Sequence, residues 1–300
     1  MKILVAGASG LIGGALVSTL SRAGHEVFPL VRPPRAASQG QVSWNPERGE
    51  LDVAAAAGAA AVVNLSGANI GERRWSESRK QEIRSSRVNA TRALVEALAQ
   101  LEPRPGVFVS VSAVGYYGSR GNDPLDETSP AGTGFLARLC TDWEAEALGA
   151  DRRGIRTVLL RFGVILAGSG GALAQMLGPF RLGLGGRLGS GNQWMPWLSL
   201  DDAVGMLRQA IENSGWQGIY NAVAPEPVTN LAFTKALGRT LRRPTLFPVP
   251  RAALRTIFGQ MADEMLLASQ RVRSTRLPET GYSYSYPELE PALRRALTRP

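Results

Sequence analysis

The chain has 300 residues, of which 44% are hydrophobic, and its mean hydropathy is −0.07. This length is enough for one large α/β domain or for one domain with a smaller lobe. No stretch approaches the ~18 apolar residues of a membrane span, and the N-terminus leads directly into a predicted strand, so we expect a soluble, cytoplasmic protein without a membrane partner. The lone Cys140 excludes an internal disulfide and, with a single histidine, a His/Cys metal cluster.

The formal net charge is +9, and residues 231–300 hold 12 Lys and Arg against 5 Asp and Glu. Such a skew can indicate binding to nucleic acid or to another anionic surface. The sequence contains no matching recognition motif and no series of interleaved aromatic residues. We therefore expect no nucleic-acid partner and attribute the charge to a preference for arginine and to an anionic cofactor.

The first 32 residues predict a nucleotide-binding unit. An apolar strand at Lys2–Ala6 is followed by a glycine-rich turn, a helix over 15–23 and a second strand at Glu26–Val31. Such a turn lets the backbone approach a pyrophosphate, and the start of the helix supplies N–H groups and partial positive charge. The glycine spacing is G-x-x-G-x-x-G rather than G-x-G-x-x-G. The candidate phosphate-binding residues are Gly7, Gly10, Leu11, Ile12 and Gly13.

The end of the second strand predicts which dinucleotide binds. An NAD site usually places Asp or Glu there, whereas an arginine accommodates the 2′-phosphate of NADP. This strand ends in Val31 and Arg32, with Arg35 close by. Because Arg32 can hold a phosphate through two hydrogen bonds, we predict NADP; a solvated loop arginine is the alternative.

Strands and helices then alternate, which predicts an α/β, Rossmann-type doubly wound parallel sheet. Strands are expected at 41–44, 60–65, 107–112 and 157–160, and helices at 51–57, 77–100 and 136–148. We assign residues 1–165 to an NADP-binding domain whose sheet is completed by part of 190–225. Residues 166–300, which begin glycine-rich and become proline-punctuated, are assigned to a substrate-side lobe.

Several motifs together resemble one known family. They are Gly7–Gly13, Asn64–Gly67, Ser112–Gly118, Trp197–Asp202, Gly185–Gly191 and Ala224–Asn230. The chain resembles an atypical extended short-chain dehydrogenase/reductase of the NAD(P)-dependent epimerase/dehydratase superfamily. The resemblance covers nearly the whole chain, including a family-specific C-terminal segment over 247–297.

That family uses a Ser and a Y-x-x-x-K pair, in which the tyrosine passes a proton while the nicotinamide passes a hydride. Ser112 matches the serine at the strand end, but Leu136 and Cys140 stand where the tyrosine and the lysine are expected. Leucine cannot transfer a proton, and a thiol replaces a fixed ammonium poorly. The nearest replacement proton donors are Tyr116 and Tyr117, which can equally be walls of the crevice.

The resemblance also implies further cofactor contacts. Leu65 and Ser66 end a central strand and Gly67 follows them, at the edge where ligands of such sheets bind. The family pattern adds Glu82 and Arg87 on the long helix, which by themselves read as ordinary helix-face charges. It also places Ile165 against the nicotinamide. No metal is expected.

Two functions follow as hypotheses. The first is an NADP-dependent oxidoreductase or epimerase that acts on an unidentified small polar substrate. The second is a non-catalytic, NADP-binding regulatory or interaction protein, in keeping with the cell-division label of some relatives. By analogy with similar proteins, the long helix and its neighbour could form a homodimer interface.

Overall fold

An eight-stranded sheet forms the centre of the molecule in the computed structural model, which describes residues 1–33 and 35–298. Its strand order is β12-β8-β6-β5-β1-β2-β3-β4, and all neighbours pair in parallel except β3 and β4. The bounds are β1 (Lys2–Ala6), β2 (Glu26–Val31), β3 (Val42–Asn45), β4 (Glu50–Leu51), β5 (Ala61–Asn64), β6 (Val107–Ala113), β8 (Arg156–Phe162) and β12 (Gly218–Ala222). The predicted Rossmann-type doubly wound sheet is confirmed. Its edge strand β12 comes from the 190–225 stretch that we expected to complete it.

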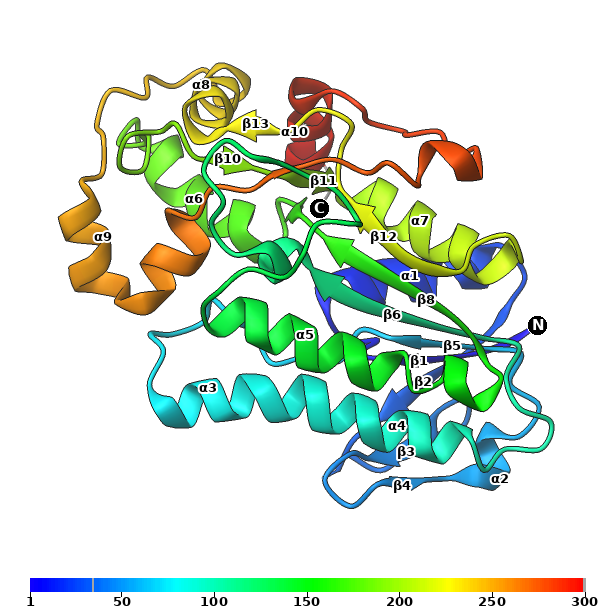
Figure 1. Cartoon of the computed structure of the whole chain (residues 1–300). Helices are drawn as coiled ribbons and strands as arrows, with labels where there is room; N and C mark the ends of the chain where they lie inside the picture. The colour runs from blue at the N-terminus through cyan, green and yellow to red at the C-terminus, as the bar shows by residue number, and fades with distance from the viewer. Residues whose placement is uncertain (34, 299–300) are drawn as a thin grey trace.

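Helices cover both faces of this sheet (Figure 1). On one face lie α1 (Leu11–Arg22) and α7 (Leu200–Glu212), and on the other α3 (Glu77–Arg84), α4 (Ala90–Leu98) and α5 (Phe135–Ala147). The short α2 (Val53–Ala56) precedes β5. The helix predicted over 77–100 is continuous but contains a π-helical turn at Ser85–Asn89, which joins α3 to α4.

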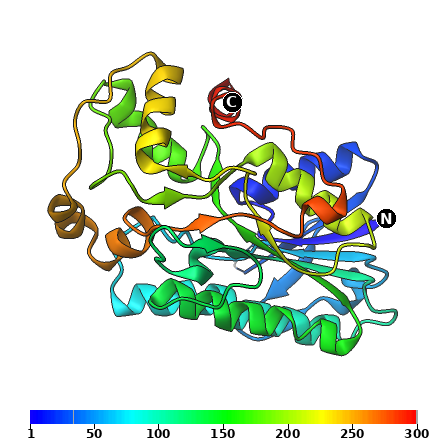
Figure 2. The same ribbon diagram turned by 45° about the horizontal axis from the view of Figure 1, so that its top comes forward.

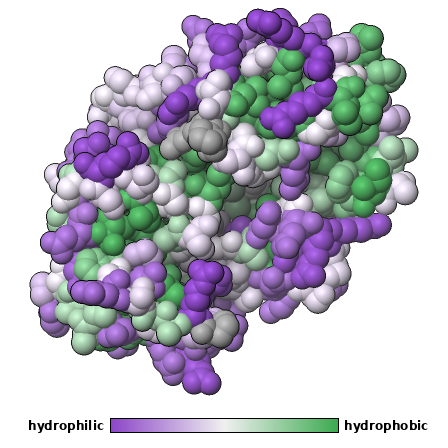
Figure 3. All heavy atoms as spheres, turned by 180° about the vertical axis from the view of Figure 1, so that it is seen from behind, coloured by the Kyte–Doolittle hydropathy of each residue, from purple (hydrophilic) through white to green (hydrophobic). Residues whose placement is uncertain are grey.

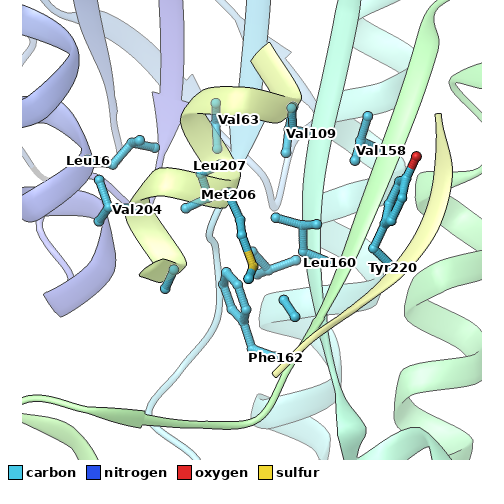
Figure 4. Packing of buried hydrophobic residues seen from close by; sticks show 14 of the residues in the cluster. Leu16, Val63, Val109, Val158, Leu160, Phe162, Val204, Met206, Leu207 and Tyr220 are labelled. Atoms are coloured by element: carbon cyan, nitrogen blue, oxygen red, sulfur yellow. The ribbon is translucent and has the colours of Figure 1, made fainter. Parts of the chain in front are cut away.

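Side chains alternate between the two faces, so each central strand is buried on both sides. In β1, Ile3 and Val5 belong to the cluster that includes α1 and α7, whereas Leu4 and Ala6 belong to the cluster beneath α4. Figure 4 shows side chains of α7 packed over strand residues such as Val109 and Leu160.

The outer face of α4 and α5 carries ion pairs. Arg84 of α3 contacts Asp142 at 2.9 Å, and Arg92 of α4 contacts Glu146. A homodimer through these helices stays a prediction.

A smaller lobe packs beside the carboxyl ends of the strands (Figure 2). Its separate core includes Leu173, Leu177, Phe233 and Leu293. The lobe contains β9 (Val164–Leu166), α6 (Gly171–Arg181), β10 (Trp194–Met195), β11 (Trp197–Ser199), β13 (Val228–Thr229), α8 (Asn230–Leu241), α9 (Arg251–Phe258) and α10 (Leu289–Thr298).

The C-terminal segment leaves this lobe and returns along the sheet domain. After a π-helical turn at Ala262–Leu266, β14 (Arg271–Val272) pairs in parallel with β7 (Pro124–Leu125). Glu127 accepts hydrogen bonds from the backbone N–H groups of Asn221 and Thr275. Residues 259–288, which we call the strap, therefore contact both the lobe and the sheet domain. Across the described residues, no helix is long and apolar enough to cross a membrane.

Candidate active site

The glycine-rich turn is built around two close backbone contacts. Gly7 has φ +77°, and a Cβ there would lie 2.5 Å from the carbonyl oxygen of Leu65. A Cβ on Gly13 would lie 2.2 Å from the carbonyl oxygen of Gly7. Both positions therefore require glycine, one to approach β5 and the other to seat α1 against the turn. These two contacts account for the first and last glycines of the G-x-x-G-x-x-G pattern.

Beside this turn runs a groove of about 810 Å³. It is bounded by the turn, by the end of β2, by the loop after β5 and by the β3–β4 hairpin. Seven predicted cofactor residues line it, namely Gly7, Gly10, Val31, Arg32, Leu65, Ser66 and Gly67. Arg35 also lines the groove, so two guanidinium groups stand at the end where a 2′-phosphate is expected.

Sequence reasoning missed the hairpin side of the groove. Trp44, Asn45, Pro46 and Glu47 form part of its wall. Their position depends on the antiparallel pairing of Trp44 with Leu51, and a two-residue edge strand leaves little periodic signal in a sequence.

Six other predicted residues lie outside the lining of this groove, namely Leu11, Ile12, Gly13, Glu82, Arg87 and Ile165. Leu11 and Ile12 begin α1 and pack against the core, with Leu11 next to the backbone of Gly170. Ile165 lies in β9 and pairs with Leu198. Glu82 is bound by Arg73 at 2.9 Å and by Arg79 at 2.7 Å, and these partners lower its pKa.

Arg87 lies directly beneath the groove. A Cβ on Gly67 would be 2.8 Å from the guanidinium carbon of Arg87, so the two groups touch. Its one hydrogen bond within the described structure is to the carbonyl oxygen of Ile83, and the guanidinium also stacks on Trp143. Burial lowers the pKa of Arg87 to about 10, which still leaves the group charged at neutral pH. A cation without a carboxylate partner at this point favours an anionic ligand.

A buried polar network lies under the carboxyl end of β6. Ser112 donates a hydrogen bond of 2.6 Å to Oε1 of Glu144, which also accepts from Nε of Arg161 at 2.9 Å. The second carboxylate oxygen accepts from Arg161 at 2.7 Å. Burial acts to lower the pKa of Arg161, but the hydrogen bonds and charge of Glu144 outweigh it and raise the pKa. The Ser112 hydroxyl is therefore part of this buried network, and its role as the family's catalytic serine stays a prediction.

The two candidate tyrosines differ sharply. Tyr117 has no exposed surface, and its hydroxyl donates to Asn221 at 2.7 Å and accepts from Arg161 at 2.9 Å. Burial raises its pKa to about 12. The predicted role of Tyr117 as a proton donor is therefore unsupported, because its hydroxyl is enclosed and already bonded. Tyr116 is partly exposed and packs its ring against Tyr117 and Arg161.

Leu136 and Cys140 lie one turn apart on α5 and face the same short 3₁₀ turn, η2 (Val114–Tyr117). A Cβ on Gly115 would lie 3.3 Å from Leu136 Cβ and 3.8 Å from the Cys140 sulfur. Burial is the largest influence on the Cys140 thiol and raises its pKa to about 11. Cys140 is therefore an uncharged thiol at neutral pH and cannot supply the positive charge of a lysine.

The strap holds this part of the site from outside. Both carboxylate oxygens of Glu264 accept hydrogen bonds from the start of α5, at 3.0 Å from Phe135 N and 2.8 Å from Leu136 N. Gln270 donates to the carbonyl oxygen of Val114 in η2. No local sequence pattern signals either contact, since each joins residues more than 120 positions apart.

A groove that is lined by a glycine-rich turn and lies at the carboxyl ends of the strands of a doubly wound sheet is typical of a Rossmann-type nucleotide-binding protein. The described part of the chain has no group of three or more His, Cys, Asp or Glu that could hold a metal.

The chain belongs to the NAD dependent epimerase/dehydratase family, which it matches over residues 3–222. Residues 249–296 match a domain of unknown function, DUF1731, which contains the strap together with α9 and most of α10. The resemblance to an extended short-chain dehydrogenase/reductase with its own C-terminal domain is thereby confirmed.

Full-length relatives show the same assignment. An epimerase family protein of Mycobacterium bovis is 45% identical, with 99% of this chain and 98% of that protein aligned. Epimerase family protein SDR39U1 of Homo sapiens is 40% identical over 98% of this chain and 99% of its own.

Two solved structures are similar along the entire chain. The crystal structure of human SDR39U1 with NADPH superposes with a TM-score of 0.89 and 38% identity, covering 99% of both chains. A nucleoside-diphosphate sugar epimerase from Corynebacterium glutamicum has a TM-score of 0.82 and 33% identity, and covers 99% of this chain and 58% of its own.

Proposed function

We propose that this protein binds NADP and is an oxidoreductase or epimerase of the extended short-chain type that acts on a small polar substrate. The observation that carries the proposal is a groove that is lined both by the glycine-rich turn and by Arg32 and Arg35. The NADPH of the similar human structure supports the same cofactor for this chain.

The residues present fit such a cofactor. Gly10 is the N-cap of α1 and lines the groove, so the start of this helix, which attracts anions, lies at the groove wall. Arg32 and Arg35 supply the positive charge that a 2′-phosphate needs, and Arg87 adds an unpaired cation beneath Gly67. When bound, the nicotinamide exchanges a hydride with the substrate.

Among the predicted catalytic residues, Tyr116 is the best candidate to pass a proton. It is partly exposed, whereas Tyr117 is enclosed and Ser112 is bonded to Glu144. No hydrogen bond engages the Tyr116 hydroxyl within the described structure, and its ring is fixed by Arg161. General acid–base help of this kind is typically worth about 10²–10⁴-fold in rate.

The second candidate function is an NADP-binding protein without turnover. Leu136 and Cys140 favour it, because they fill the positions of the usual pair with groups that carry no charge and, for Leu136, no proton. In that case the groove would hold NADP as a structural or sensing ligand.

One experiment separates the two functions. Loss of NADPH absorbance is followed with carbonyl compounds, and epimerisation of sugar nucleotides, which leaves the cofactor unchanged overall, is followed with NADP by chromatography of the products, with wild type and Tyr116→Phe in parallel. Turnover that falls about 10²-fold or more in Tyr116→Phe, but is retained in Tyr117→Phe, supports the enzyme with Tyr116 as donor. Tight NADPH binding without turnover of any compound supports the second function.

A further inference from the structure

Four large apolar side chains are exposed together at the outer end of the smaller lobe. Leu182 and Leu184 follow α6, and Leu246 and Phe247 lie between α8 and α9. Their exposed fractions are 76%, 56%, 76% and 56%. We call these four residues the lobe tip. Side chains of this kind usually leave water when a protein binds a partner or a membrane.

The lobe tip is one surface rather than two loops that happen to be apolar. Arg243 Nε donates to the carbonyl oxygen of Arg181 at 2.8 Å, and Val249 N donates to that of Arg187 at 2.9 Å. A Cβ on Gly186 would lie 1.9 Å from the carbonyl oxygen of Phe247, so the two backbones touch. The two segments that carry the four apolar residues therefore lie side by side.

This surface is strongly positive. Five exposed arginines surround the lobe tip, and none forms an ion pair within the part of the chain that the structure describes; they are Arg181, Arg187, Arg242, Arg243 and Arg251. The sequence has no Asp or Glu over 152–200 or 227–262, the two stretches that supply the tip. Seen from behind, the side of the molecule formed by α6, α8 and α9 carries hydrophobic atoms next to strongly hydrophilic ones (Figure 3). Part of the positive charge of the C-terminal half is therefore concentrated around the lobe tip, away from the cofactor groove.

We propose that the lobe tip docks this protein on an anionic phospholipid bilayer. The leucines and Phe247 enter the boundary between headgroups and acyl chains, while the surrounding arginines contact lipid phosphates. This binding needs no spanning helix, and it departs from our expectation that the protein has no membrane partner.

The chemistry of the surface favours lipid over nucleic acid. Aliphatic side chains strengthen binding only by leaving water, and a sugar–phosphate backbone offers them no apolar medium. A single-strand site would instead present several aromatic rings for base stacking, and the lobe tip has one.

Docking in this way leaves the cofactor groove accessible, because none of the lobe-tip residues lines it. The inference is therefore independent of the proposed function. Calorimetry with NADPH reports on the groove, whereas vesicle binding reports on the lobe tip.

The test is co-sedimentation of the full chain with vesicles of phosphatidylcholine alone or with one third phosphatidylglycerol, at about 0.1 M salt. We expect binding to the anionic vesicles only. The variants Leu182→Ser/Leu246→Ser and Arg242→Gln/Arg243→Gln should each weaken it by about tenfold or more. Val53→Ser and Arg22→Gln are the controls, since both residues are exposed on the sheet domain. Each variant is checked for an unchanged melting temperature.

Three results would overturn the proposal. They are failure to bind anionic vesicles, binding that is unaffected by Leu182→Ser/Leu246→Ser, and preferential binding of a duplex DNA competitor at equal phosphate concentration. Dimerisation of the free protein that is abolished by the same leucine variant would assign the lobe tip to a second copy of the chain instead.

Discussion

The guanidinium carbon of Arg161 lies 3.5 Å from the centre of the Tyr116 ring, while Glu144 binds the same guanidinium through two hydrogen bonds. Arg161 comes from β8, Glu144 from α5 and Tyr116 from η2. The ion pair therefore joins α5 to β8, and the contact of Arg161 with the Tyr116 ring adds η2. These contacts lie near Leu136 and Cys140, which occupy the positions of the usual Tyr–Lys pair. Held by its ion pair with Glu144, Arg161 fixes the orientation of the one candidate proton donor that remains partly exposed.

Breaking this pair should be costly. Glu144→Gln leaves the Arg161 charge buried without its counter-charge, and we expect a loss of about 3–5 kcal/mol in the free energy of unfolding by urea denaturation. The control is Asp142→Asn on the same helix, which breaks the exposed pair with Arg84 and should cost less than about 1 kcal/mol. Equal losses in the two variants would show that the Glu144–Arg161 pair has no special role.

The strap should stabilise α5 through one side chain. Glu264→Ala removes the acceptor for the first two amides of the helix, and we expect a loss of about 0.5–2 kcal/mol. Glu264→Gln keeps one acceptor oxygen and should lose less. Asp263→Asn, which affects a half-exposed pair with Arg255, serves as the control. If hydrogen exchange at Phe135 and Leu136 is unchanged in Glu264→Ala, the capping role is wrong.

Gly13 and Gly14 are neighbours in α1, but only Gly13 lies too close to the turn to accept a side chain. Gly13→Ala places a Cβ against the carbonyl oxygen of Gly7 and should cost about 1–3 kcal/mol in stability, with weaker NADPH binding. Gly14→Ala meets nothing closer than 3.8 Å and should be neutral or stabilising by up to about 1 kcal/mol, because alanine favours a helix. Thermal unfolding of the two variants distinguishes these effects, and a stable Gly13→Ala would contradict the close contact.

Low pH should weaken the hydrogen bonds by which Glu127 holds the strap, and so destabilise the fold. Burial acts to raise the pKa of this carboxyl, but hydrogen bonds from Ser274, Asn221 and Thr275 outweigh it and lower the pKa in the folded protein. Its stabilising effect is therefore complete above the ordinary glutamate pKa and is lost as the pH falls through the lower folded value. We expect Glu127→Gln to melt at a lower temperature than wild type at pH 7, with the difference shrinking below about pH 4. A constant difference at all pH values would mean that Glu127 acts without its charge.

Local sequence patterns predicted the parts of the fold that depend on local chemistry. The glycine pattern from Gly7 to Gly13 predicts a nucleotide-binding turn, and this turn lines the groove in the structure. The apolar runs of the sequence predict the central strands to within a few residues of their observed bounds. The π-helical turn at Ser85–Asn89 was not predictable, because hydrophobic periodicity does not register one extra residue in a helix.

The contacts that complete the site join distant parts of the chain. Glu144 meets Arg161 only because α5 packs on β8, and Glu264 meets α5 only because the strap turns back from the lobe. No spacing rule links such positions. For the same reason, the match of Ser112 to the family's serine could be made from its place at a strand end, whereas its partner Glu144 could be seen only in the fold.

The central claim is that the groove holds NADP through Arg32, and calorimetry with NADPH and NADH tests it most directly. Wild type should bind NADPH at least about tenfold more tightly than NADH, and Arg32→Ala should lose most of that preference, since a charge-assisted hydrogen bond contributes about 1.5–3 kcal/mol. Arg22→Ala, at the far end of α1, should behave as wild type. Absence of heat with NADPH, or an unchanged preference in Arg32→Ala, would contradict the account.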